Sequence, residues 1–173
     1  MTNLKTRGWV LNALVAAIYI VLSIGPASLN LASGAIQFRL SESLNHLVVF
    51  DRKYIVGVVT GVVIFNAIFS PLGWLDVVFG GSQSLLGLLL VGWVAPKLRQ
   101  LWARFALNIA VMTITMALIA VEIVWTGHLS FATMFLPTYV SLMLSEFIIM
   151  TISAPIMYGL DKIVHFHAAI VRK

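Results

Sequence analysis

The chain lacks cysteine and has few charged residues, and each absence excludes a class of protein. Without cysteine there is no disulfide, no thiolate metal site and no thiol nucleophile. Only 10% of the 173 residues are charged and 61% are hydrophobic, whereas soluble domains have about 25% charged and about 45–50% apolar residues. A soluble fold of this size cannot bury so much apolar surface, so the composition indicates a membrane protein.

Motifs for catalysis and nucleotide binding are also absent. There is no glycine-rich nucleotide loop, so any ATP hydrolysis must occur on another chain. His165 and His167 are two residues apart and lie on different faces of a helix, which argues against a metal site. Gly80-Gly81-Ser82 resembles a serine-protease turn only loosely, and no histidine is in a partner position. We therefore expect no enzyme, no catalytic residues, no cofactor and no metal.

Prolines divide the apolar sequence into predicted helices. Pro26, Pro71 and Pro96 each end one, because proline does not continue a helix interior. Ser41 is a favourable N-cap for another helix. We predict an all-α integral membrane protein, a single domain over residues 1–173 with six transmembrane helices at about 9–25, 41–50, 54–70, 82–95, 101–125 and 138–167.

The distribution of lysine and arginine predicts the orientation in the membrane, because both residues favour cytoplasmic loops. With six crossings and cytoplasmic N and C termini, Arg39 is the exception among the eleven. The other ten fall inside: Lys5, Arg7, Arg52, Lys53, Lys97, Arg99, Arg104, Lys162, Arg172 and Lys173. The net charge of +5 then reflects the cytoplasmic surface of a prokaryotic cell membrane and not nucleic-acid binding.

The second predicted helix is too short to cross a membrane alone. Its ten residues rise about 15 Å, half of a hydrocarbon core about 30 Å thick. One explanation is that residues 34–40 enter the membrane from outside, which requires that they are buried in protein or line a wet cavity. The other is that the helix starts near Ala35 and simply spans. Since the segment carries Gln37, Arg39 and Glu42, the first explanation predicts a polar cavity open to the outside.

Several residues on the predicted outer side are candidates for binding a solute. Arg39 and Glu42 either form a structural ion pair or contact the solute. Glu122 is a further acid on this side, and it either contacts the solute, reaches the surface or pairs with His128. For the aromatic residues, an interfacial belt is the alternative. The candidate contacts are Gln37, Arg39, Glu42, Trp74, Asp76, Tyr139 and Glu146.

Ala13 and Ala17 place two small residues four apart in the first predicted helix. Small residues at this spacing let another helix approach closely in a membrane. The pair therefore either packs inside the bundle or docks a partner subunit.

The sequence resembles that of a known family. A small six-helix protein with Ala-x-x-x-Ala in its first helix resembles the substrate-binding S components of energy-coupling factor (ECF) transporters. The stretch Gly34-Ala-Ile-Gln-Phe-Arg-Leu-Ser-Glu42, followed by Leu44, resembles the signature of the QueT family. The start Asn12-Ala-Leu-Val-Ala-Ala-Ile-Tyr19 is similar to that family's first helix.

The resemblance implies a subunit that binds a micronutrient from outside with high affinity. It implies association with a membrane coupling protein (EcfT-like) and two ATPase subunits, with the face of Ala13 and Ala17 against the coupling protein. It also implies a gating loop between the first two helices. The substrate would be a queuosine precursor, which is a deazapurine, or cobalamin or another corrinoid.

A self-sufficient ion-coupled secondary transporter is the alternative, with Glu122 or Glu146 as the coupling acid. Such carriers often contain inverted repeats, and the sequence shows no repeat. We therefore expect an S component of an ABC-type importer.

Overall fold

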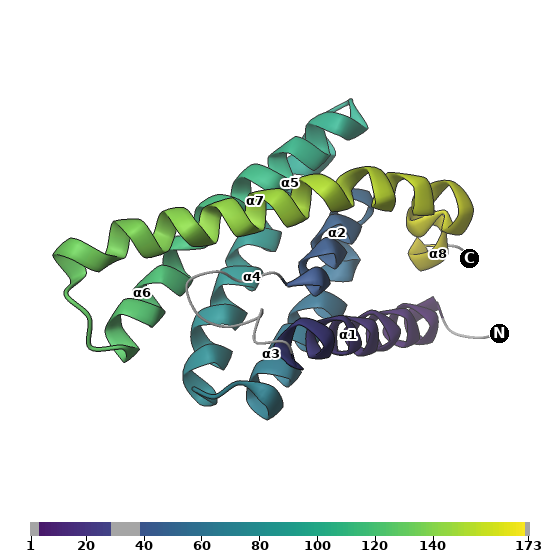
Figure 1. Ribbon diagram of the computed structural model, residues 1–173. Coiled ribbons are helices and arrows are strands. Elements are labelled where there is room, and N and C mark those ends of the chain that lie inside the picture. The colour runs from purple at the N-terminus through teal and green to yellow at the C-terminus, as the bar shows by residue number, and fades with distance from the viewer. Residues whose placement is uncertain (1–3, 29–38, 172–173) are drawn as a thin grey trace.

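The computed structural model describes residues 4–28 and 39–171, and every regular element within them is a helix (Figure 1). The prediction of an all-α protein is confirmed. The elements in chain order are α1 (Leu4–Ser28), η1 (Leu40–His46), α2 (Leu47–Phe50), η2 (Arg52–Tyr54), α3 (Ile55–Phe69), α4 (Trp74–Val94), η3 (Ala95–Lys97), α5 (Leu101–Thr115), α6 (Ala117–Thr126), α7 (Phe131–Val164) and α8 (Phe166–Val171), where η marks a 3-10 helix.

Five helical segments among the described residues are long and apolar enough to cross a membrane. They agree with a multi-pass membrane protein, whereas six such segments were predicted. The five are Thr6–Gly25, Arg52–Phe69, Trp74–Lys97, Leu101–Thr126 and Phe131–Val164.

The segment predicted as the second crossing folds as η1 and α2, of seven and four residues, and is too short to span alone. Within η1 and α2 only Leu40 is exposed, so protein surrounds the segment, as short polar segments in a membrane require. Arg39 has an extended backbone, so the alternative of one continuous helix from Ala35 to Phe50 is wrong. The predicted entry of residues 34–38 into the membrane lies outside the described residues.

Helix α4 begins at Trp74, whereas the sequence predicted a loop until Ser82. Gly80 lies within the helix because a close contact with α3 requires it: a Cβ there would lie 2.6 Å from Asn66 Nδ2. The same Asn66 amide donates to the Asp76 carbonyl at 2.8 Å and so holds the start of α4 against α3.

The last two predicted crossings also differ from the structure. The predicted helix 101–125 is interrupted at Met116, which separates α5 from α6. The last helix starts at Phe131 and includes Pro137, whereas the sequence predicted a start after this proline. Its 34 residues measure about 51 Å, longer than the hydrocarbon core. It ends at His165, which is left-handed with φ 55°.

Helices α1 and α3 pack at short distance, and this contact positions the polar interior. A Cβ at Gly61 would lie 2.6 Å from Tyr19 Cβ, so glycine is needed there. The backbone N–H of Gly57 donates to Asn12 Oδ1 at 2.7 Å, which satisfies a donor that the first turn of α3 leaves free. Tyr19 is consequently fixed at the interface of α1 with η1.

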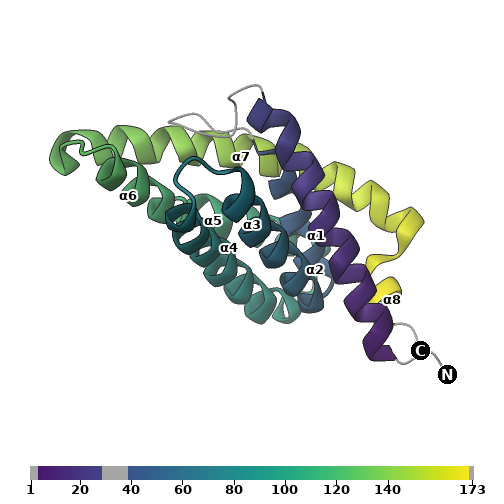
Figure 2. The same ribbon diagram turned by 90° about the horizontal axis from the view of Figure 1, so that it is seen from below.

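The basic turns lie with α8 at one end of the molecule. Tyr54 donates its hydroxyl hydrogen to the Phe166 carbonyl at 2.8 Å, and His167 Nδ1 lies 3.3 Å from Asp51 Oδ2. Arg52 and Arg104 line a hollow beside the same His167. The start of α1 and the end of α8 also lie at this end (Figures 1 and 2).

Candidate functional site

Glu42 lies at the centre of a buried polar cluster between α1 and η1, and its side chain is 1% exposed. Tyr19 donates its hydroxyl hydrogen to Glu42 Oε1 at 2.8 Å, and Asn45 Nδ2 donates to Glu42 Oε2. Next to them, Ser23 Oγ donates to Ser41 Oγ at 2.7 Å. A carboxyl group can accept a hydrogen bond at each oxygen, so the two donors hold the Glu42 side chain in a defined orientation.

A second buried network joins the short segment to α5 and α7. His46 Nε2 lies 2.9 Å from the Met150 carbonyl oxygen, which can only accept, so Nε2 carries the hydrogen. His46 Nδ1 then accepts from Asn108 Nδ2 at 3.0 Å. Neither His46 nor Asn108 was among the predicted site residues. The available signal was that Glu42, Asn45 and His46 repeat at helical spacing in an otherwise apolar region.

Four acids and one arginine from four parts of the chain interact in the same region. Glu146 on α7 interacts electrostatically with Glu42 and Arg39. Glu122 on α6 interacts with the Asp76 carboxyl and with Arg39. Glu122 and Glu146 are 1% and 3% exposed, while Asp76 is half-buried. The fold thus brings together four of the predicted contact residues and adds Glu122.

Three of these charged residues, Arg39, Glu122 and Glu146, each have a buried side-chain atom without a hydrogen-bond partner among the described residues. A buried polar atom without a partner costs about 1–3 kcal/mol, and native proteins contain few. Each such atom can therefore accept or donate one further hydrogen bond, to a ligand or to water. In the described part of the chain, the buried side-chain atoms without a hydrogen-bond partner are Arg39 Nε, Asn45 Oδ1, Asn108 Oδ1, Thr113 Oγ1, Glu122 Oε1 and Glu146 Oε1.

Two other predicted site residues, Trp74 and Tyr139, have different surroundings. Trp74 is 70% exposed at the start of α4, the position of an interfacial aromatic residue. Tyr139 donates its hydroxyl hydrogen to the Ile114 carbonyl at 3.0 Å and stacks on Phe135 with ring centroids 5.7 Å apart. Gln37 lies outside the described residues.

The predicted partner-binding residues lie on the outside of α1. Ala13 and Ala17 are exposed, whereas Ala16 between them is 5% exposed and faces the core. The exposure of the alanine pair shows that neither side chain fills space inside the bundle.

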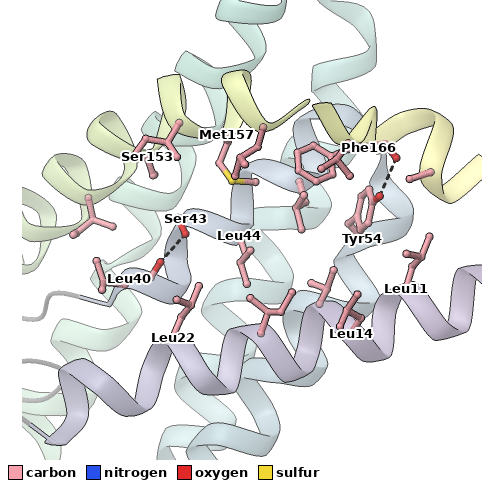
Figure 3. A pocket seen from close by; sticks show the side chains of 18 of the residues that line it. Leu11, Leu14, Leu22, Leu40, Ser43, Leu44, Tyr54, Ser153, Met157 and Phe166 are labelled. Atoms are coloured by element: carbon pink, nitrogen blue, oxygen red, sulfur yellow. Dashed lines mark hydrogen bonds between the residues drawn. The ribbon is translucent and has the colours of Figure 1, made fainter. Parts of the chain in front are cut away.

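An apolar groove of about 570 Å³ lies between α1 and the second half of α7, and Figure 3 shows it from close by. Its lining is almost entirely carbon, with Leu11, Leu14 and Ile18 contributed by α1. On average these residues lie about 110° around the helix from Ala13 and Ala17, since each residue turns an α-helix by about 100°. The groove offers no polar partners to a polar solute, so it is distinct from the cluster around Glu42.

Comparison with known proteins assigns the chain to a family. Residues 9–162 match the family model described as QueT transporter. The chain is 35% identical over 169 residues to the queuosine precursor transporter QueT of Lactococcus lactis subsp. cremoris (strain MG1363), a match that covers 94% of this chain and 96% of that protein. No solved structure matches significantly. The family suggested by the sequence resemblance is confirmed, and the chain belongs to the QueT transporter family.

Proposed function

We propose that this protein is the substrate-binding S component of an ECF-type transporter that imports a queuosine precursor. The relative's name supplies the substrate class. The observation that carries the proposal is the group of unpartnered buried polar atoms around Glu42, Glu122 and Glu146. A deazapurine has flat aromatic faces and N–H groups along its edge, and carboxylate oxygens accept hydrogen bonds from such groups.

The cluster lies at the end of the molecule that faces outside in this proposal. Asp76 lies in the first turn of α4 and Glu122 in the second half of α6, whereas the basic turns gather with α8 at the opposite end. Positive residues favour the cytoplasm. Both described chain ends lie on the basic side (Figure 1), which requires an even number of crossings. The buried segment formed by η1 and α2 then supplies the additional crossing, which is the second in chain order, and both termini are cytoplasmic.

The energy source in this proposal is a separate pair of ATPases. The sequence has no nucleotide-binding loop of its own. A membrane coupling protein docks on the exposed face of Ala13 and Ala17, where small side chains permit close backbone approach. Nucleic acid is not a partner, and the protein has no enzymatic activity by itself.

Titration of the purified protein in detergent tests the substrate. We expect a deazapurine precursor to bind with a Kd below about 1 μM and cobalamin not to bind, because the acids of the cluster are nearly fully buried and suit a small planar ligand better than a corrinoid. Tight binding of cobalamin without deazapurine binding would reverse the assignment.

Reconstitution in liposomes tests the mechanism. We expect uptake only when the coupling protein, both ATPases and ATP are present. Uptake by this chain alone that a proton uncoupler abolishes would instead support an ion-coupled carrier, with the buried Glu122 or Glu146 carboxyl as the coupling acid.

A further inference from the structure

The apolar groove between α1 and α7 has the short segment as its floor. The two long helices lie on opposite sides of it, and Leu44 of η1 lies between them (Figure 3). Leu40, the exposed residue of that segment, also lines the groove. Water does not fill an apolar cavity, and an empty one loses the dispersion contacts of its lining. In a bilayer the groove therefore requires an occupant made of hydrocarbon.

The length and width of the groove fit a single hydrocarbon chain. Its lining follows α1 from Leu11 to Leu22 and α7 from Ile149 to Val164, which is about 16 Å and about 22 Å at the rise of an α-helix. One leaflet supplies about 15 Å of hydrocarbon, half of the core. Spread over about 20 Å, the volume of about 570 Å³ gives a section of about 30 Å², whereas a helix about 10 Å across has a section of about 80 Å². The groove is thus too narrow to enclose a partner helix.

One end of the groove carries a positive charge. Tyr54 and Phe166 line that end (Figure 3), and Arg7 interacts electrostatically with Tyr54. Arg7 precedes the lining residue Leu11 by four positions, so both lie on the same face of α1. Arg7 is exposed and forms no ion pair with a described residue. Its charge is therefore available to an anion at the membrane surface.

The acids near this end already have partners. Asp51 and Asp161 also interact with Tyr54. Asp161 Oδ1 accepts from the backbone N–H of Phe166 at 2.9 Å, and Asp51 Oδ2 lies 3.3 Å from Nδ1 of His167. These contacts hold both carboxyl groups and leave the arginine at the end of the groove for another anion.

We propose that the groove binds one anionic phospholipid from the leaflet on the basic side of the molecule, with an acyl chain between α1 and α7 and the phosphate at Arg7. Arginine suits this position because its planar N–H groups match two phosphate oxygens and its long side chain reaches the headgroup level. The groove is separate from the cluster around Glu42, so the inference does not depend on the proposed substrate.

Native mass spectrometry of the full chain tests the ligand. The protein is purified in detergent with equal amounts of dioleoyl phosphatidylglycerol, which is anionic, and dioleoyl phosphatidylcholine, which is zwitterionic. We expect one retained lipid and a preference of about fivefold for phosphatidylglycerol, the contribution of one basic residue near an anionic headgroup. Retention of no lipid, equal retention of the two lipids, or a dimer of this chain in place of the lipid would overturn the proposal.

Matched variants test the location. Arg7→Gln should lower the preference to about twofold or less, whereas Arg99→Gln, at an exposed arginine outside the groove, should keep it. Ile156→Trp fills the groove and should abolish retention, whereas Leu86→Trp on α4 should not; the two side chains are 58% and 57% exposed, and only Ile156 lines the groove. Full preference in Arg7→Gln, or full retention in Ile156→Trp, would overturn the placement. If a variant does not fold, the competition between the two lipids on the unmodified protein still decides the ligand.

Discussion

Gly61→Ala tests whether the contact of α1 with α3 positions the binding site. The added Cβ would lie 2.6 Å from Tyr19 Cβ and 3.1 Å from the Ala16 carbonyl oxygen. Neither neighbour is the flexible end of a side chain, so the helices must separate. Overpacking of this kind typically costs about 1–3 kcal/mol, and the better helix propensity of alanine offsets up to about 1 kcal/mol. We expect a net destabilisation of about 1–2 kcal/mol.

The same change should weaken ligand binding, because Tyr19 orients Glu42 through its hydroxyl group. Gly159→Ala is the matched control: it makes the same substitution in α7, where a Cβ meets nothing within 4 Å, and should leave stability and binding unchanged or slightly improved. Unfolding in detergent and ligand titration measure both effects. A Gly61→Ala protein with the stability and affinity of the control would refute the close approach of α1 and α3.

Three further variants separate binding, docking and stability. Arg39→Ala should lower ligand affinity more than tenfold with a smaller change in melting temperature, because Arg39 interacts with Glu122 and Glu146. Arg99→Ala, at an exposed arginine, is its control. Unchanged affinity in the Arg39→Ala protein would exclude a binding role for Arg39. The double substitution of Ala13 and Ala17 by Trp should leave ligand binding intact, since both positions are exposed. It should abolish ATP-dependent uptake and co-purification of the coupling protein. Loss of ligand binding would show that the alanine pair supports the bundle. His46→Ala should lower the free energy of unfolding by at least about 2 kcal/mol, because it removes the buried imidazole that bonds to Met150 and Asn108. A variant as stable as the parent protein would show that this network is dispensable.

Helix ends were easier to predict from the sequence than helix starts. Proline ends a helix for a local steric reason, and α3 and α4 do end just before Pro71 and Pro96. The prediction for Pro26 was wrong, because α1 continues through this proline to Ser28. The start of α4 was predicted too late because Gly80 was taken as part of a loop, whereas its role is a close contact with Asn66 on another helix. Such a contact depends on which helices become neighbours, and no local pattern specifies that.

The sequence predicted those residues of the candidate site that are charged and lie within an apolar segment. Arg39, Glu42 and Glu146 each stand out because charge in an apolar segment is costly. Partners distant in the sequence could not be found this way: His46 and Asn108 are 62 positions apart. Their pairing depends on the rotation of α5 against η1, which follows from the packing of the whole bundle.

The short segment formed by η1 and α2 separates the polar groups that stabilise the fold from those available to a ligand. A full-length apolar helix would satisfy its backbone internally and would place no polar side chains at this depth. Here the inner part of η1 has its partners within the protein, since His46 bonds to both α5 and α7. At its outer start, Arg39 Nε has none among the described residues. Substitutions along one short segment should therefore change from affecting affinity at Arg39 to affecting stability at His46, and that order gives the direction from which the ligand enters.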